Sequence, residues 1–188
     1  MKEEVESRLR SSLGDAIVSV DEFNEQVSIE IKRDRITDVC KILKEELGFN
    51  YLSDLCGADM LNYDDASARK AYLAIEHEHR PHQVPNEERF LVVYQLTSLK
   101  DKSGDSDLGK RLRLKVKVDG DNPVCPSITS VFKSANWYER EAFDMFGIEF
   151  EGHPDMRRMY MPEEYEYYPL RKDFPLMGVP GSIPLPRR

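Results

Sequence analysis

Three histidines near the middle of the chain have a type and spacing that could bind a metal ion. His77 and His79 lie two positions apart, so a β-strand would turn both toward one face, and His82 follows shortly after. Arg80 and Pro81 interrupt such a strand before the third histidine is reached. We therefore interpret the three as a solvated strand end. A metal-dependent enzyme is the alternative, and metal analysis of the purified chain would test it.

Other short patterns resemble catalytic or ligand-binding motifs but fail at a defining position. Asp119 and Asp121 begin like a calcium loop, yet position six is not glycine and position twelve is Ser130 instead of glutamate. Residues 67–70 match the SxxK pattern of acyl-enzymes, but a four-residue match in a polar stretch carries little weight. The ten glycines include no GxG, which excludes the usual cradles for dinucleotides and phosphates.

Two pairs of carboxylates are candidates for acid–base chemistry. Glu139 and Glu141 lie two positions apart on an expected helix, so their side chains diverge, and Glu163 and Glu164 are adjacent. The sequence identifies no nucleophile, metal or pocket beside either pair. The residues alone therefore predict an interaction subunit with no catalytic, cofactor-binding or metal site of its own.

A row of cations is expected on one strand. Arg111, Arg113, Lys115 and Lys117 alternate with apolar residues, which places all four on the same face. The whole chain has 27 Lys and Arg against 35 Asp and Glu, a net charge of −8, and this disfavours a nucleic-acid partner. We interpret the row as a solvated strand face that opposes aggregation. An acidic partner is the open alternative.

The elements that must position these residues predict an α+β fold, with helices packed on a mixed, largely antiparallel sheet in a two-layer body. Apolar residues at i, i+4 and i+8 from Val5 predict a first helix. An apolar stripe predicts a second helix over 36–47, with Asp34 as its cap and Gly48 at its end. Strands are expected over 16–20, 27–31, 71–77, 89–99 and 111–118, the last two antiparallel across the loop 101–107.

A further helix is expected in the C-terminal third. Asn136 is a suitable N-cap, Glu139 completes a capping box, and the helix runs to Phe146 and ends at Gly147. A shorter helix is expected over 127–132. Apolar residues of the longer helix gather on one side, and the residues expected on the other side are Trp137, Arg140, Glu141 and Asp144, with an Arg140–Asp144 pair within reach.

The last 52 residues differ in composition from the rest. Residues 137–188 hold ten of the 18 aromatic residues, seven of the 11 prolines and five of the seven methionines. Beyond Pro162 the prolines interrupt every potential helix, yet large apolar side chains continue from Tyr165 to Met177. We predict an extended, Pro-rich C-terminal tail that buries these side chains on a partner chain, in preference to its own body.

The cysteines and the N-terminal residues exclude several classes. Cys40, Cys56 and Cys125 are widely separated and form no CxxC, which argues against a disulfide framework, a zinc site or an iron–sulfur site. We expect three buried, inert thiols in a reducing compartment. Residues 1–6 are acidic and resemble neither a secretory signal nor a transit peptide. No apolar run approaches the roughly 20 residues of a membrane span.

Three blocks near the C-terminal end are residues 135–148 (ANWYEREAFDMFGI), 150–158 (FEGHPDMRR) and 169–176 (PLRKDFPL), and a shorter block lies upstream at residues 51–59 (YLSDLCGAD). The three resemble the signature of the respiratory complex I (NADH:quinone oxidoreductase) C-subunit family, the 30-kDa-type peripheral-arm subunit, and the shorter one is similar to a further block of that family. The residues that match the signature are Trp137, Glu139, Arg140, Glu141, Asp144, Gly147, His153, Pro154, Asp155, Arg157, Arg158, Pro169, Leu170, Arg171, Lys172, Asp173, Phe174 and Pro175.

The resemblance implies a non-catalytic structural and assembly subunit in the peripheral arm of a proton-translocating quinone oxidoreductase. The implied neighbours are the complex I D and B subunits, between which quinone is reduced, so this chain would buttress the quinone site without forming it. Flavin, iron–sulfur clusters, NADH and quinone would belong to other subunits, and the electron donor (NADH, ferredoxin or a deazaflavin) stays open. The implied location is the cytoplasmic side of the cell membrane, or the matrix or stromal side in an organelle.

The resemblance also divides the chain into an α+β body (1–135), a signature helix with a His-Pro turn (136–162) and a subunit-binding tail (163–188). Its charged residues are interpreted as interface and scaffold groups. Arg140→Ala, or truncation before Tyr165, is then expected to weaken assembly while the body still folds. Two alternatives stay open: the equivalent subunit of a membrane-bound energy-converting hydrogenase, and a self-contained binding module whose tail folds onto its own body.

Overall fold

The computed structural model describes residues 2–24, 26–61, 88–99 and 109–175, and the structural statements below refer to these residues. Several sequence predictions lie outside them. These are the group of His77, His79 and His82 with the strand 71–77, the SxxK pattern at 67–70, the loop 101–107 and the tail from residue 176 onward.

A five-stranded mixed sheet forms the centre of the fold. In space its strands follow the order β1 (Ile17–Phe23), β2 (Gln26–Ile31), β5 (Arg111–Val118), β4 (Phe90–Thr97) and β3 (Tyr51–Asp59). β1 with β2, β5 with β4 and β4 with β3 are antiparallel, whereas β2 runs parallel to β5. The predicted α+β class and the mixed, largely antiparallel sheet are confirmed.

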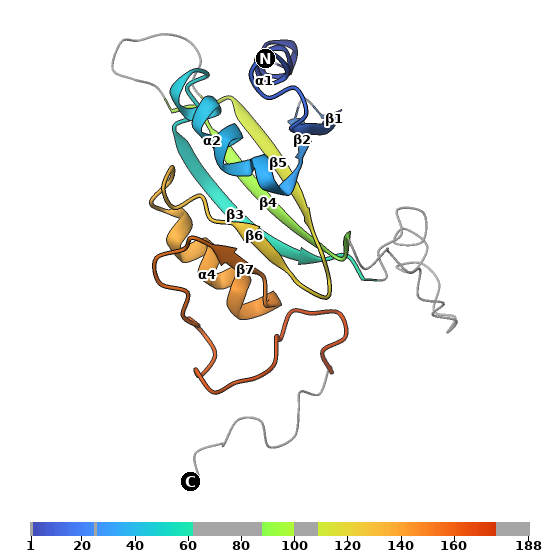
Figure 1. Cartoon of the computed structure of the whole chain (residues 1–188), viewed down its shortest axis with the longest axis vertical. Coiled ribbons are helices and arrows are strands. Elements are labelled where there is room, and N and C mark those ends of the chain that lie inside the picture. Colours follow the sequence, from blue (N-terminus) through green and yellow to red (C-terminus); the bar gives the residue numbers. More distant parts are fainter. Residues whose placement is uncertain (1, 25, 62–87, 100–108, 176–188) are drawn as a thin grey trace, which may run out of the picture.

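The described helices pack on one face of this sheet. α1 (Lys2–Ser12) and α2 (Ile36–Glu45) lie across the strands, and α4 (Ala135–Phe146) lies below them along β3 (Figure 1). A Cβ on Gly57 of β3 would stand only 2.7 Å from the Phe146 ring, so the close approach of α4 to the sheet requires glycine there. The side chains that α1 and α2 bury are Val5, Leu9, Ile36, Val39, Cys40 and Leu43.

Strict alternation along β5 and β4 builds the core. Leu112, Leu114, Val116 and Val118 of β5 are buried beside the inward-facing residues of β4, and the cations between them point to the opposite face. The inward-facing side chains of β4 are Phe90, Val92, Tyr94 and Leu96. One sheet face is therefore apolar and covered by helices, and the other, which we call the open face, carries the predicted row of cations.

The structure corrects two predicted helix caps. Asp34 lies in a 3-10 helix, η1 (Arg33–Arg35), and α2 begins after Arg35 without a side-chain cap. α4 begins at Ala135 after Ser134, also without a side-chain cap, so Asn136 lies inside the helix and does not cap it. In both cases the predicted cap lies inside a helical segment, whereas an N-cap residue needs the non-helical backbone that directs its side chain to the amides two or three positions ahead.

Residues 127–132 form turns, and the helix predicted there is wrong. A single turn closes where the amides of Val131 and Phe132 both donate to the Ile128 carbonyl oxygen, at 2.9 and 2.8 Å. The Ile128 amide and the Ser127 hydroxyl are instead engaged by the Glu139 side chain. These tertiary bonds hold the segment against α4 and replace the ladder that a helix would need.

Three of the described strands were not predicted from the sequence. β3 has a bulge between Leu52 and Asp54 and contains Gly57, which breaks the alternation that identifies a strand. β6 (Val124–Pro126) and β7 (Glu149–Glu151) form a separate parallel pair beside α4. Elements of three residues are too short to carry a periodic signal.

The three thiols do not share one environment. Cys40 and Cys125 are buried, as predicted, whereas Cys56 is exposed on β3, so the prediction is wrong for this residue. Burial raises the pKa of Cys125 to about 12, which leaves it protonated and inert. Cys56 is exposed because it alternates with Leu55 along the strand and faces away from the helices.

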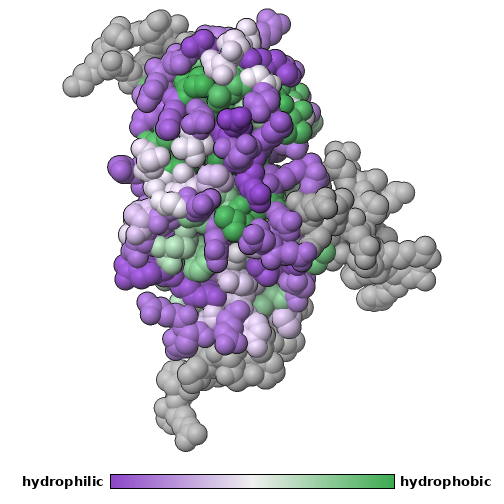
Figure 2. All heavy atoms as spheres, viewed as in Figure 1, coloured by the Kyte–Doolittle hydropathy of each residue, from purple (hydrophilic) through white to green (hydrophobic). Residues whose placement is uncertain are grey.

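The surface on the helix side is mostly hydrophilic, and its hydrophobic areas are small and separate (Figure 2). Among the described helices, none is both long enough and apolar enough to cross a membrane.

Candidate functional site

α4 carries most of the charged residues of the first signature block, and two of them are fully buried. Glu139 and Asp144 have no exposed surface, while Glu141 is exposed and the Trp137 side chain is 60% exposed. The predicted solvent-facing position of Asp144 is therefore wrong. The predicted Arg140–Asp144 pair is replaced by a pair between Asp144 and Arg158.

Asp144 organises the segment that follows the His-Pro turn. One of its carboxylate oxygens accepts a hydrogen bond from Arg158 Nη1 at 2.8 Å. The other accepts from three successive backbone amides, those of Met159, Tyr160 and Met161, at 2.9, 2.6 and 3.1 Å. Arg158 also donates to the Asp144 carbonyl oxygen at 3.1 Å. A single buried carboxylate thus fixes the path of the chain over residues 158–161.

The protonation of Asp144 follows from these partners. Burial alone would raise the pKa of this carboxyl, but the Tyr160 amide, the Arg158 guanidinium and the two other amides outweigh it and lower the pKa below its ordinary value. Asp144 is therefore an anion at neutral pH. Its positive partner is nearly as buried, because the Arg158 side chain is only 8% exposed.

Arg158 also connects this carboxylate to the aromatic residues of the tail. Its guanidinium carbon lies 5.0 Å from the centre of the Tyr168 ring and 5.9 Å from that of Tyr165. Tyr165 is only 5% exposed, so it buries its ring on its own body. The prediction of burial on a partner is wrong for Tyr165, whereas Tyr167 and Leu170 are 40% and 53% exposed.

Arg140 and His153 hold the His-Pro turn against α4. Arg140 lies 5.0 Å from the Trp137 ring and donates to the carbonyl oxygens of residues 157 and 158, at 3.0 and 3.2 Å. The Asp155 amide donates to His153 Nδ1 at 3.0 Å, so Nε2 carries the ring proton and donates to the Asn136 carbonyl oxygen at 3.1 Å. Asp155 and Arg157 form an exposed bidentate pair at 2.7 Å.

Glu139 holds the turn at 127–132 from inside the body. Its carboxylate accepts from the Ile128 amide at 2.8 Å and from the Ser127 hydroxyl at 2.7 Å. Burial raises the pKa of this carboxyl from its ordinary 4.5 to about 7, against the lowering effect of the two donors. The predicted capping-box role of Glu139 is wrong, because its carboxylate accepts from Ser127 and Ile128 and not from the backbone amide of Asn136, the predicted N-cap.

The raised pKa of Glu139 predicts a pH-dependent stability. Between pH 4.5 and 7 the folded chain keeps a proton on Glu139 that the unfolded chain has already released. The contribution of Glu139 to the free energy of unfolding must therefore fall as the pH rises through that window. Urea denaturation at half-unit pH steps measures the slope. Glu139→Gln, which can still accept from Ile128, should flatten it; an unchanged slope in that variant would contradict the assignment.

A second buried carboxylate fastens the tail to the sheet. Asp59, at the end of β3, accepts from Arg89 at 3.2 and 2.9 Å and from the Lys172 amide of the tail at 2.9 Å. Arg89 also donates to Asp173 at 2.8 Å. Burial opposes ionisation of Asp59, but Arg89 and the amides of Leu61 and Lys172 lower its pKa overall. Arg89 thus bridges the body and the tail through two carboxylates.

Arg171 makes the third attachment between tail and body. Its Nε donates to the Phe146 carbonyl oxygen at 2.6 Å, and its guanidinium carbon lies 4.3 Å from the Tyr168 ring centre and 5.1 Å from that of Phe90. Gly147, which ends α4 with φ +73°, faces this group directly. The end of the signature helix and the third signature block therefore meet in one place.

The structure brings eight of the 18 signature residues into one network with Asp59 and Arg89. We call it the tail-anchoring network, and its members are Asp59, Arg89, Arg140, Asp144, Gly147, His153, Arg158, Arg171, Lys172 and Asp173. Glu139 belongs to a separate buried site, and the signature residues that are exposed are Trp137, Glu141, Pro154, Arg157, Leu170, Lys172, Asp173 and Pro175. The sequence predictions missed Arg89, which lies outside every signature block. Nothing in the sequence next to a single arginine indicates which distant carboxylates it will bind.

The chemistry of this network is structural. Its buried carboxylates are saturated by arginines and backbone amides, which leaves them no free electron pair directed at a substrate. Within the described residues, no group of three or more His, Cys, Asp or Glu side chains could hold a metal ion. The arrangement is suited to holding an extended chain in one conformation.

Fold and site together define a class of protein: an α+β chain that presents a C-terminal segment fastened by arginine–carboxylate bonds. Residues 29–180 match the family described as "Respiratory-chain NADH dehydrogenase, 30 Kd subunit". The chain is 42% identical over 171 residues to the NADH-quinone oxidoreductase C subunit of Roseiflexus sp. (strain RS-1), covering 90% of this chain and 81% of that one. The corresponding C subunit of Coxiella burnetii (strain Dugway 5J108-111) is 38% identical over 184 residues, covering 93% and 76%.

The chain therefore belongs to the complex I 30 kDa subunit family, the family of the NADH-quinone oxidoreductase C subunit. The resemblance identified from the signature blocks is confirmed.

Two solved structures share the fold. The trypsin-resistant fragment (1–134) of Nqo5 superposes with a TM-score of 0.61 at 31% identity, covering 82% of this chain and 99% of that one. A chain of the membrane-bound sulfane sulfur reductase, an archaeal respiratory membrane complex, superposes with a TM-score of 0.66 at 22% identity, covering 93% and 86%. At that identity the second likeness concerns the fold alone.

Proposed function

We propose that this chain is a non-catalytic structural and assembly subunit of the peripheral arm of a proton-translocating NADH:quinone oxidoreductase. In this role it lies on the cytoplasmic side of the cell membrane, or on the matrix or stromal side in an organelle, and contacts the D and B subunits. Flavin, iron–sulfur clusters, NADH and quinone are bound by other subunits. Family membership supports the complex, and the surface around the tail-anchoring network supports the structural role.

The observation that carries the proposal is a set of exposed apolar side chains bordering the tail-anchoring network. Trp137 is 60% exposed, Tyr160 62% and Leu170 53%. Each is held in place beside the network. The Trp137 ring stacks with Arg140, and the Tyr160 amide donates to Asp144. The Leu170 amide donates to the Met145 carbonyl oxygen of α4. Large apolar groups held rigidly in solvent are typical of protein interfaces.

The proposal predicts that removing two of these anchors weakens assembly without unfolding the chain. In the full-length chain carrying Trp137→Ala and Leu170→Ala, we expect at least a tenfold lower yield of the other oxidoreductase subunits in affinity purification. Buried aromatic and aliphatic anchors at interfaces each contribute about 2 kcal/mol, and 1.4 kcal/mol is a factor of ten. The control is Val18→Ala, which trims a 54% exposed apolar side chain on β1, away from both this network and α4.

The unfolding midpoint separates assembly from folding. Both variants should unfold at the same urea concentration as the parent chain, because exposed side chains contribute little to stability. Equal recovery of the partner subunits with the double variant and with Val18→Ala would refute the proposed interface.

A further inference from the structure

The open face of the sheet, on the side opposite the helices, carries a concentration of positive charge. Alternation turns Arg111, Arg113, Lys115 and Lys117 to this face, where the antiparallel register sets them beside Thr97, Gln95, Val93 and Leu91 of β4. α4 cannot cover it, because Gly57, which contacts Phe146, faces the opposite side together with Val92. In a chain of net charge −8, four aligned cations are a local reversal of sign.

Among the described residues, two of the four cations have partners and two have none. Lys117 bonds Glu30 at 3.3 Å and Glu88 at 2.8 Å. Arg113 is held at 2.9 Å by the neutral amide of Gln26, which fixes its position but leaves its charge unbalanced. Within the described part of the chain, Arg111 and Lys115 form no ion pair. The row thus keeps more positive charge than the sheet itself neutralises.

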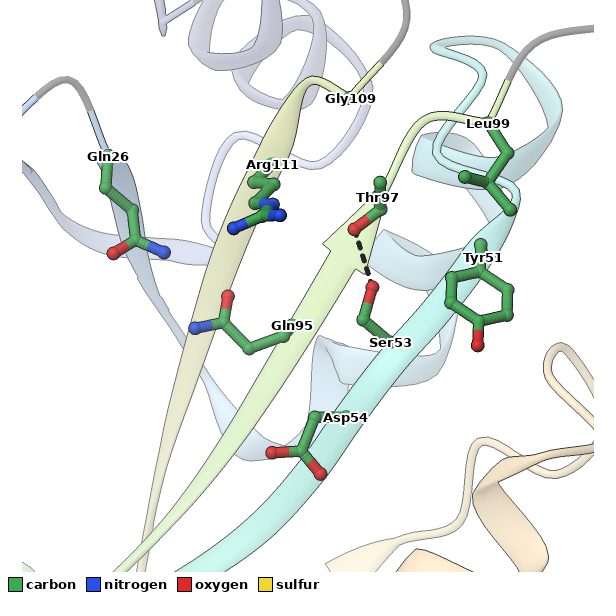
Figure 3. A pocket seen from close by; sticks show the side chains of 9 residues that line it. All are labelled: Gln26, Tyr51, Ser53, Asp54, Gln95, Thr97, Leu99, Gly109 and Arg111. Carbon is green, nitrogen blue, oxygen red and sulfur yellow. Dashed lines mark hydrogen bonds between the residues drawn. The ribbon is translucent and has the colours of Figure 1, made fainter.

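A recess of about 540 Å³ lies at one end of the row, beside Arg111. Figure 3 shows its lining side chains projecting from β2, β5, β4 and β3 on the side away from the helices. Gln95, Ser53 and Thr97 offer hydrogen-bonding groups along the floor, with the two hydroxyls bonded to each other at 2.5 Å. Asp54, the one carboxylate among the described lining residues, forms no ion pair with Arg111.

The rim of the recess is apolar. Tyr51 is 47% exposed and Leu99 43% exposed, and they stand side by side at one edge (Figure 3). Arginine and tyrosine are enriched at the hot spots of protein interfaces, and within the described residues Arg111 has no ion-pair partner and Tyr51 is exposed. A solvated strand face that only prevents aggregation needs charges, but it needs neither the recess nor the apolar rim.

We propose that the open face is a second docking surface, which binds an acidic, extended segment of a partner protein. One carboxylate of that segment enters the recess and pairs with Arg111, and a second pairs with Lys115, with an apolar side chain against Tyr51 and Leu99. A nucleic acid does not fit, since the rest of the surface is acidic and would repel a long polyanion. A short acidic segment of a protein contacts only the four cations and so avoids this repulsion.

This surface lies on the sheet face opposite to α4, so it is distinct from the interface in the proposed function. It gives the subunit two opposite sides with different chemistry: apolar anchors beside the tail-anchoring network, and cations on the open face. A subunit that buttresses other proteins without chemistry of its own needs more than one such surface.

Charge reversal in the affinity-tagged full-length chain, expressed in its native host, tests the inference. With the double variant Arg111→Glu, Lys115→Glu, we expect the yield of one co-purifying protein to be at least tenfold lower than with the parent chain. The matched control is Arg10→Glu, Lys41→Glu, which makes the same charge change at side chains 52% and 51% exposed on α1 and α2. The control should retain that protein. Equal recovery in both variants would overturn the proposal.

Zero-length carbodiimide cross-linking of the purified complex identifies the contact directly. In the parent complex Lys115 should be joined to an Asp or Glu of another protein. In Arg111→Lys a new cross-link should appear at position 111, because the amine now lies in the recess. Cross-links from Lys115 only to carboxylates of this same chain, or release of the bound partner by nuclease treatment, would refute an acidic protein partner.

The two proposals fail separately. If the chain co-purifies with no oxidoreductase subunit, the proposed function fails, but a cross-link from Lys115 to an acidic segment of any other protein still supports the docking surface. If the oxidoreductase subunits are retained by the Arg111→Glu, Lys115→Glu variant and Lys115 remains uncross-linked, only the docking surface fails.

Discussion

Replacing Asp144 by alanine is expected to destabilise the chain by about 3–5 kcal/mol, because breaking a buried ion pair by removing one partner leaves the other charge uncompensated. The charge left without a partner is the guanidinium of Arg158, whose side chain is 8% exposed. The same substitution also removes the acceptor of the Met159, Tyr160 and Met161 amides. Urea denaturation of the full-length chain, followed by tryptophan fluorescence and circular dichroism, measures the change.

The matched control is Asp155→Ala in the same segment. Asp155 also pairs with an arginine, at 2.7 Å, but both side chains are largely exposed, and exposed pairs contribute little. We expect its unfolding midpoint to stay close to that of the parent chain. Asp144→Asn should fall between the two, since its amide keeps one accepting oxygen and loses the charge. If Asp144→Ala were no more destabilising than Asp155→Ala, the central role of Asp144 would be wrong.

The main elements of the fold were predictable because their signals are local. The 3.6-residue stripe of α2 and the twofold alternation of β5 each follow from how a single element buries one face. β3 gave no such signal, because a bulge and Gly57 break its alternation, and the glycine is there to admit the Phe146 ring of a helix almost 90 residues later. That requirement is tertiary and leaves no trace in the neighbouring sequence.

The candidate site was predictable in its members but not in its geometry. The resemblance identified Asp144, Arg158 and Arg171, while helical periodicity placed Asp144 on the solvent side. Periodicity assumes that charged residues face water, and it fails where a carboxylate is buried against arginine and backbone amides supplied by a distant segment. Arg89 was missed for a related reason, since its two carboxylate partners lie 30 and 84 positions away.

The tail-anchoring network also explains how a segment without regular structure holds a definite path. Residues 158–161 are fixed by Asp144, and Lys172 and Asp173 by Asp59 and Arg89. The segment needs no helix or strand of its own, because side chains of the body satisfy its backbone amides. The exposed apolar groups along it are thereby ordered before any partner binds, which lowers the entropic cost of association.

Gly147→Ala is expected to detach the tail at its third attachment. An alanine Cβ at this position would lie 2.6 Å from Arg171 Nη2 and 2.6 Å from the Tyr168 ring. These two side chains cannot simply move aside, because they stack on each other, and Arg171 is also bonded to the Phe146 carbonyl oxygen. Left-handed backbone costs an alanine about 1–2 kcal/mol, and overpacking adds about 1–3 kcal/mol.

Gly152→Ala separates these two costs. Gly152 also has a left-handed backbone, with φ +82°, but a Cβ there would meet nothing within 4 Å. Gly152→Ala should lose only the stability that the left-handed backbone costs an alanine, about 1–2 kcal/mol. Trypsin cleavage after Arg171 and Lys172 reports the opening of the tail, and each 1.4 kcal/mol of local destabilisation speeds it about tenfold when cleavage follows the open population.

The expected order of cleavage rates is therefore Gly147→Ala well above Gly152→Ala, with the parent chain slowest or equal to the latter. Only the clash at Arg171 and Tyr168 distinguishes the two variants, since both carry the same backbone cost. Equal rates in the two glycine variants would mean that the tail is not held at the end of α4. A faster rate in Gly147→Ala alone would show that the end of the signature helix holds the path of the tail, and with it the exposed side chains of the proposed interface.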